Sequence, residues 1–123
     1  MNNLDLIRAK NALEACSSIG NGANDGEVVK KVPSYIINNG LLAAAAFANE
    51  NARKKEKSGY EDVFKAIVKH LVSIKRIDPI PESSEWLIKY LVRQDSAKLR
   101  DVTAETMAYL NYLRRFASKK KED

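Results

Sequence analysis

The chain has 123 residues, of which 45% are apolar and 30% are charged, a composition typical of one soluble folded domain. Lysine and arginine outnumber aspartate and glutamate by 21 to 16, giving a net charge of +5. This surplus favours a polyanionic partner, although it also serves solubility. No apolar run reaches the roughly 20 residues of a membrane span, and the first residues lack the pattern of a secretory signal. We therefore expect a cytoplasmic protein.

The inventory of reactive residues is small. One histidine, His70, and one cysteine, Cys16, exclude both a clustered zinc site and an intrachain disulfide. A Cys16–His70 nucleophilic pair is possible by number, but Cys16 has the pattern of a small buried helical residue and His70 lies near the edge of an apolar helix face. Residues 20–26 lack the ending of a phosphate-binding loop, so we interpret them as a flexible helix–helix connection. We expect no enzyme activity and no cofactor.

Helical spacing begins near the start of the chain. Residues 4–19 place one apolar stripe along a helix, which we expect to face the core: Leu6, Ala9, Leu13 and Cys16. A second apolar region spans residues 28–37. Pro33 disfavours α geometry at the preceding residue, so this helix either begins at Pro33 or is kinked there.

Two junctions delimit a third helix. Asn39 and Gly40 end the second helix, because both residues tolerate left-handed geometry. Residues 41–48 read LLAAAAFA, a strong helix former whose small side chains let neighbouring helices approach closely. Residues 53–57 are charged, so we expect an exposed helix end there that terminates at Ser58-Gly59.

The fourth helix has the clearest amphipathic pattern. Its apolar residues follow at steps of three and four: Tyr60, Val63, Phe64, Ile67, Val68, Leu71 and Ile74. Two prolines within residues 78–81 end this helix. Ser83 or Ser84 then caps a short helix that carries Trp86, Leu87, Tyr90 and Leu91.

The last helix begins at Ser96 or Thr103, both of which are good N-caps. Its expected core stripe is Val102, Thr106, Tyr109, Leu110, Leu113, Phe116 and Ala117. The sequence thus predicts an all-α fold, a compact bundle of five or six helices that forms a single helical domain over residues 1–123.

The positive charge is concentrated in two segments. Residues 21–58 carry a net charge of +2 and residues 96–123 carry +3. On the last helix, Tyr112, Arg115 and Lys119 share a face that is distinct from the core stripe. A basic face with an aromatic ring is the minimal form of a single-stranded nucleic-acid surface. The alternative is a solvated helix face with Tyr112 at a protein contact.

Two stretches resemble one known family. Residues 32–47 contain VPSYIINNGLL followed by AAF, and residues 100–117 contain Arg-x-x-Thr-x-Glu followed by AYLNYLRRFA. Together, at this spacing and chain length, they resemble the small α-helical subunit of the type III-B CRISPR effector, the Cmr RNA-targeting complex. The resemblance covers nearly the whole chain.

The resemblance implies a role without catalysis. Such subunits stack in several copies beside the backbone subunits and help hold the guide RNA–target RNA duplex, while target cleavage belongs to the backbone subunit. It also implies that Asn39 and Gly40 form a helix–helix turn. By the same resemblance, Thr103 and Glu105 match the start of the last helix, where we expect a capping role.

We therefore expect a non-catalytic, RNA-binding subunit of a ribonucleoprotein in antiviral RNA interference. The resemblance matches Tyr112, the expected interface residue, to an aromatic position and Arg114 and Arg115 to a basic pair. The expected phosphate contacts, which add affinity without sequence information, are Lys30, Lys31, Arg53, Lys54, Arg114, Arg115 and Lys119.

The expected partners follow from the same interpretation. They are the other subunits of the Cmr effector complex, guide RNA and target RNA, and further copies of this chain within the complex. We expect a monomer when the chain is isolated, and no membrane partner. The alternative function is a helical protein–protein adaptor with no nucleic-acid role.

Overall fold

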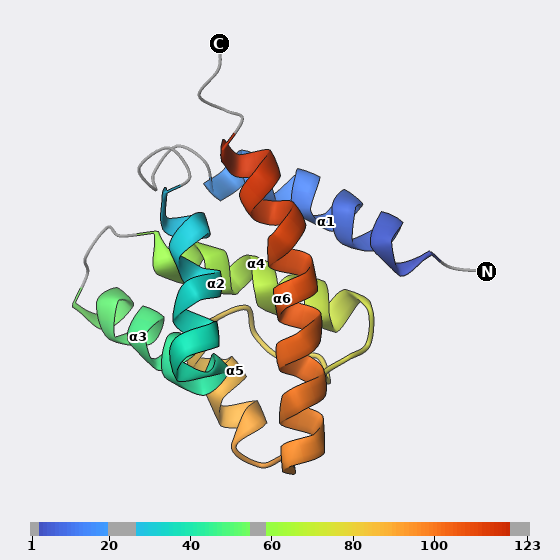
Figure 1. The fold of residues 1–123 in the computed structure, drawn as a ribbon. Coiled ribbons are helices and arrows are strands. Elements are labelled where there is room, and N and C mark those ends of the chain that lie inside the picture. Colours follow the sequence, from blue (N-terminus) through green and yellow to red (C-terminus); the bar gives the residue numbers. More distant parts are fainter. Residues whose placement is uncertain (1–2, 20–26, 55–58, 119–123) are drawn as a thin grey trace.

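The structure, a computed structural model, describes residues 3–19, 27–54 and 59–118 (Figure 1). Within these ranges it has no strand and six helices: α1 (Leu4–Ile19), α2 (Glu27–Asn39), α3 (Leu41–Arg53), α4 (Tyr60–Ser73), α5 (Ser84–Leu91) and α6 (Ser96–Ser118). The predicted all-α bundle is confirmed. In these described segments, no helix combines the length and apolar character needed to cross a membrane. The expected connection at residues 20–26 and the charged residues 55–58 lie outside the described residues.

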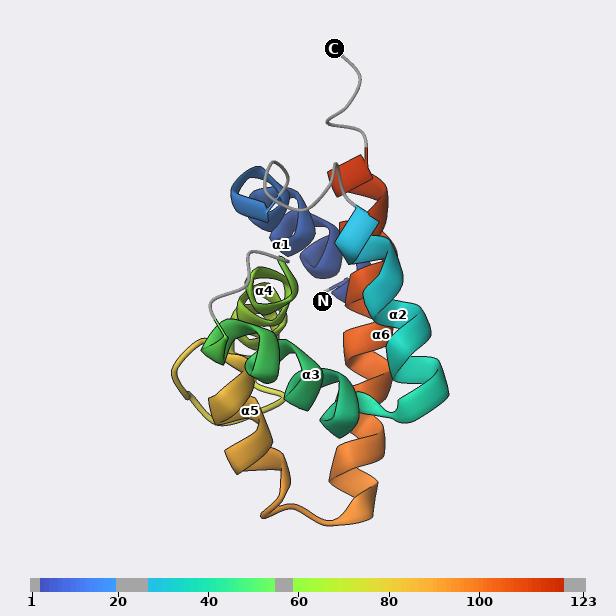
Figure 2. The same ribbon diagram turned by 90° about the vertical axis from the view of Figure 1, so that its left-hand side faces the viewer.

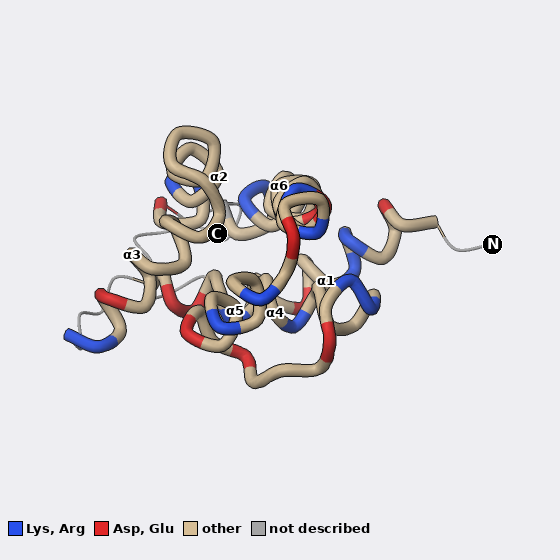
Figure 3. The backbone as a smooth tube through the Cα atoms, turned by 90° about the horizontal axis from the view of Figure 1, so that it is seen from below, with Lys and Arg blue, Asp and Glu red and all other residues tan. Residues whose placement is uncertain are grey.

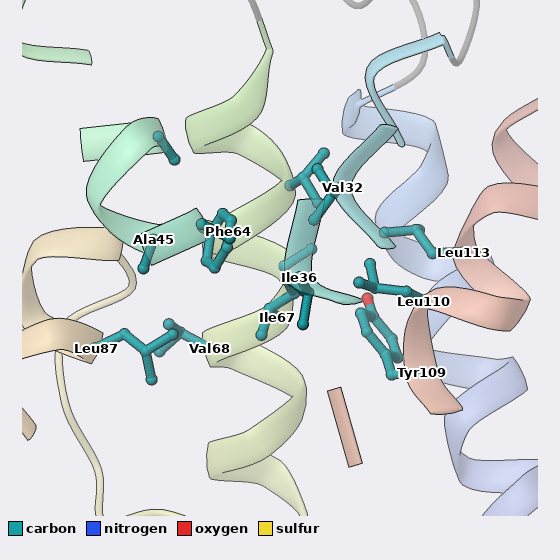
Figure 4. Close-up of a cluster of buried hydrophobic side chains, with 14 of the residues drawn as sticks. Val32, Ile36, Ala45, Phe64, Ile67, Val68, Leu87, Tyr109, Leu110 and Leu113 are labelled. Carbon is teal, nitrogen blue, oxygen red and sulfur yellow. The ribbon is translucent and has the colours of Figure 1, made fainter. Parts of the chain in front are cut away.

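The long helix α6 runs along one side of the molecule, with α2 antiparallel beside it and α1 across its upper part (Figures 1 and 2). Helices α3, α4 and α5 form the other side. The core lies between the two groups, where side chains of α4 face those of α2 and α6 (Figure 4). Its labelled members include Val32, Ile36, Phe64, Ile67, Leu110 and Leu113, all at most 3% exposed.

The predicted core faces of α4 and α5 agree well with the structure. Five of the seven stripe residues of the fourth helix are buried, and Tyr60 and Ile74 are partly buried. Ser83 is the N-cap of α5, and its hydroxyl accepts a hydrogen bond from Trp86 N at 3.1 Å. Leu87 and Leu91 of α5 are buried, whereas the Trp86 side chain points outward.

The junction between α2 and α3 is also as predicted. Gly40 has φ 92°, and its N–H donates to Ile36 O at 2.7 Å. A Cβ at Gly40 would meet nothing within 4 Å, so the backbone conformation rather than space requires glycine here. Pro33, however, lies inside α2, so a start of the helix at Pro33 is wrong. The helix extends upstream because Val28 and Val29 are buried against the core, which outweighs the local cost of the proline.

The predicted stripe of the first helix is only partly right. Cys16 is buried as predicted, but Leu6 and Leu13 are 68% and 59% exposed, Ala9 is only partly buried, and α1 buries Ala12 and Ile19 beside Cys16. The side chain of Arg8 continues this inward face one turn earlier and is only 17% exposed. The rest of the prediction failed because it placed charged residues on the surface, whereas Arg8 lies on the buried face of α1.

The expected capping role of Thr103 and Glu105 is wrong as well. Helix α6 begins at Ser96, and the Asp95 side chain accepts from Lys98 N at 2.8 Å, as an N-cap residue does. Thr103 and Glu105 therefore lie in the second and third turns. The Thr103 hydroxyl donates to Leu99 O at 2.7 Å, one turn back along the helix.

Glu105 is the centre of a buried polar cluster that joins α1, α4 and α6. Arg8 donates to this carboxylate through Nε, 2.9 Å from Oε2, and Nη2, 2.7 Å from Oε1. His70 Nε2 lies 2.9 Å from Oε2, and the side chains of His70 and Glu105 are each 1% exposed. A bidentate pair of this kind is the stronger form of an arginine–carboxylate contact. One buried carboxylate thus fixes the mutual position of three helices.

The surrounding contacts keep His70 neutral. The Asn11 amide nitrogen donates to Ser73 Oγ at 3.1 Å, and Ser73 Oγ itself donates to His70 O. The same amide nitrogen lies 2.9 Å from His70 Nδ1, so Nδ1 accepts and the ring proton is on Nε2, facing Glu105. The imidazole stacks on Tyr109, with ring centroids 4.3 Å apart.

The histidine and the glutamate of this cluster have pKa values below their usual ones. Burial lowers the pKa of His70 from 6.5, although the hydrogen bond to Glu105 raises it in part. Burial raises the pKa of Glu105, but the hydrogen bonds from Arg8 and His70 outweigh burial and bring it below 4.5. At neutral pH the cluster is therefore an ionised carboxylate, a guanidinium and a neutral imidazole.

Replacing Glu105 should destabilise the fold strongly. Glu105→Gln keeps the shape but leaves the guanidinium of Arg8 without its buried partner, and we expect the free energy of unfolding to fall by about 2–4 kcal/mol in urea titrations. The control is Asp101→Asn, which removes an exposed carboxylate paired with Arg76 at 2.9 Å and should cost about 0.5 kcal/mol or less. Equal losses in the two variants would contradict a central role for Glu105.

The low pKa of His70 predicts acid-sensitive stability. The unfolded chain takes up a proton near pH 6.5 and the native state does so only at lower pH, so stability should fall below pH 6.5. The slope is at most about 1.4 kcal/mol per pH unit. The Glu105 contribution is lost only below its usual pKa of 4.5.

The single histidine makes this test specific. In His70→Gln, thermal or urea unfolding should show little change in stability between pH 7 and pH 5, because no other histidine titrates in that window. A wild-type stability that stays constant over this range would refute the assignment of a neutral His70.

Candidate nucleic-acid interface

The basic residues predicted to contact RNA lie in two separate places. Lys30 and Lys31 lie near the start of α2, and Arg114 and Arg115 near the end of α6. These two helix ends are adjacent in both ribbon views (Figures 1 and 2). Arg53 is the last residue of α3 and Lys54 follows it, and this helix end lies away from the other two in both views; Lys119 falls outside the described residues. Lysines and arginines occur on all six helices (Figure 3).

We call Lys30, Lys31, Arg114 and Arg115 the α2/α6 basic end. Lys30, Lys31 and Arg115 are exposed, while Arg114 is partly buried and donates from Nη2 to Asn111 Oδ1 at 3.3 Å. The residues on the inner side of the same turns are at most 3% exposed: Val28, Val29, Val32, Leu110, Leu113 and Ala117. The cations therefore stand on backbone that the core holds in place.

Few acidic residues lie near the basic end; Glu27, the first residue of α2, is one turn before Lys30 and Lys31. Residues 28–39 and 106–118 contain no aspartate or glutamate. Lys30, Lys31 and Arg114 form no ion pair within the part of the chain that the structure describes. Lys54, by contrast, lies 3.1 Å from the Glu50 carboxylate on its own helix. The positive potential is thus less compensated at the α2/α6 basic end than at Lys54.

Tyr112 lies at the boundary between core and surface. It is partly buried and packs against the core cluster, and its ring centroid is 6.4 Å from that of Phe116. Phe116, predicted to belong to the core stripe, is likewise only partly buried, whereas Leu110 and Leu113 are fully buried. An interface role for Tyr112 stays a prediction.

The two residues weighed as a nucleophilic pair have other partners. The Cys16 thiol donates to Leu13 O at 3.1 Å within its own helix. His70 is bonded to Asn11 and Glu105. Across residues 3–19, 27–54 and 59–118, no three histidine, cysteine, aspartate or glutamate side chains gather in a group that could hold a metal ion.

An exposed aromatic on α5 was missed at the level of sequence. Trp86 is 43% exposed, and Lys89 Nζ lies 4.7 Å from the centroid of its ring. Tyr90 follows at i+4 on the same face of α5, and Arg93 lies in the turn after the helix; all four residues line one groove. The spacing of aromatic and basic residues was visible in the sequence, but an aromatic at helical spacing is more often a core residue.

The family assignment rests on a comparison with family models. The model described as CRISPR-associated protein (Cas_Cmr5) matches residues 5–119, almost the whole chain. The chain belongs to this family. The resemblance inferred from residues 32–47 and 100–117 is thereby confirmed, and the chain is a Cmr complex subunit by family. Searches of curated proteins and of solved structures returned no match.

Proposed function

We propose that this Cas_Cmr5 chain is a non-catalytic small subunit of a type III-B CRISPR ribonucleoprotein, and that its α2/α6 basic end binds RNA phosphates. The observation that carries the proposal is the meeting of two helix ends, each with two cations and with Glu27 as the one acidic residue close to them along the chain, on a part of the fold that buried side chains hold in place. Family membership supports the complex, and the arrangement of charge supports RNA as the ligand.

The contacts would add affinity and leave sequence selection to guide–target base pairing. Lysine and arginine side chains bind phosphate oxygens, which are the same at every nucleotide. Four cations in one copy give weak binding. Several copies stacked along guide and target RNA would bind multivalently, so that affinity rises on assembly. This arrangement suits a subunit that holds RNA during antiviral interference.

The proposal predicts a change in the salt dependence of RNA binding. We expect Lys30→Gln/Lys31→Gln, placed in the assembled complex, to weaken target-RNA binding and to lower the log–log salt slope by about one to two units. The matched control is Lys65→Gln/Lys69→Gln, which also removes two exposed lysines from one helix but leaves the basic end intact. Binding measured by filter retention over a series of salt concentrations distinguishes the two variants.

Two outcomes would contradict the proposal. If both double variants shift affinity and slope equally, the cations act only through net charge. If neither variant changes RNA binding and subunit assembly is normal, the chain acts as a protein–protein adaptor and the basic end serves solubility.

A further inference from the structure

A groove runs beside α5, at the opposite end of the molecule from the α2/α6 basic end (Figures 1 and 2). Its volume is about 690 Å³, and it lies between residues 78–80 and the outer side of α5 with the turn that follows. The apolar lining is formed by Pro79, Ile80, Trp86, Tyr90 and Val92. Val92 is 64% exposed, so two large apolar side chains, Trp86 and Val92, meet solvent here.

Helix α5 is held so that Trp86 must face outward. The Ser83 hydroxyl caps its first turn, and Ser84 donates to the Glu61 carboxylate through both its backbone N–H, at 3.0 Å, and its hydroxyl. Leu87 and Leu91 are buried at 0% and 2% exposure on the inner face. Rotation of the helix to bury the indole would expose both leucines, so Trp86 is presented to the groove by the fold itself.

Two cations accompany the rings in this groove. Lys89 Nζ lies over the Trp86 ring and 3.1 Å from the Glu85 carboxylate, and both of these charged side chains are about half exposed. An exposed pair of this kind contributes little stability, so the ammonium can move to another anion at small cost. Arg93 is exposed and forms no ion pair with the described residues, and Asp78 is the one acidic residue of the lining.

We propose that this groove binds single-stranded RNA, with a nucleobase stacked on Trp86 and the adjoining phosphates on Arg93 and Lys89. The groove lining combines two rings, Trp86 and Tyr90, with two cations, Lys89 and Arg93, as a strand combines bases with phosphates, and every base has a face that can stack. The choice of RNA as ligand rests on the proposed function, whereas the site itself shares no residue with the α2/α6 basic end. One subunit could thus contact RNA at both of its ends, through a single RNA strand or through two different strands.

The test uses the only tryptophan of the chain as its probe. The full-length protein is titrated with a fluorescently labelled single-stranded oligoadenylate of about 12 nucleotides at low salt. The tryptophan fluorescence of the protein and the fluorescence anisotropy of the labelled RNA are measured together. Stacking should quench the Trp86 emission in a saturable way that follows the anisotropy. Arg93→Gln should weaken binding several-fold, and Trp86→Ala about tenfold or more by anisotropy, with unchanged circular dichroism.

The basic-end variant separates this site from the proposed function. Lys30→Gln/Lys31→Gln should reduce the overall affinity for RNA but keep the quenching of Trp86 at saturation, while Lys65→Gln should change neither.

Absence of Trp86 quenching up to ~1 mM RNA overturns the stacking site, since even non-specific binding is usually tighter than that. RNA binding that depends on Lys30 and Lys31 without quenching overturns the site alone. If addition of other Cmr subunits changes the Trp86 emission and addition of RNA does not, the groove is a protein-docking surface instead.

Discussion

The Glu105 carboxylate is the constraint on which the packing of this subunit depends. A carboxylate with 1% exposure needs charged or hydrogen-bonding partners, and it takes them from two other helices, through Arg8 of α1 and His70 of α4. Helix α1 buries mostly small residues such as Ala12, so the ionic contact supplies much of the specificity with which it docks. Because the cluster fixes α6 against α1 and α4, it also helps determine where the last turns of α6 meet the first turns of α2.

Sequence periodicity predicts the elements whose buried faces are mainly apolar. Helix α4, which buries His70 among apolar residues, and the Gly40 junction follow from spacing and backbone chemistry. The stripe of α1 was misplaced because Arg8 lies on the buried side, and a charged residue is ordinarily assigned to the surface. The role of Glu105 was missed for the same reason. Its partners are 97 and 35 residues away in the sequence, so only the fold shows that three polar side chains satisfy one another.

The candidate site could be predicted in part. The surplus of basic residues in two segments and the family resemblance point to Lys30, Lys31, Arg114 and Arg115. Only the fold brings α2 and α6 side by side and shows that Lys54 pairs with Glu50. Trp86 was assigned by spacing to a helix with a buried face, and the structure shows that Leu87 and Leu91 occupy that face. The result is a rigid helical body with a cationic end and an aromatic, cationic groove at the other end. A subunit with two such surfaces could hold RNA without reading its sequence.

The most direct measurement of this claim is ultraviolet cross-linking of the assembled Cmr complex with its guide and target RNA, followed by mass spectrometry of the peptides of this subunit. The account predicts cross-links within α2 near Lys30, within the last turns of α6 near Arg115, and at Trp86 of α5. Cross-links confined to the region of Arg53, or none on this subunit while other subunits cross-link efficiently, would contradict it.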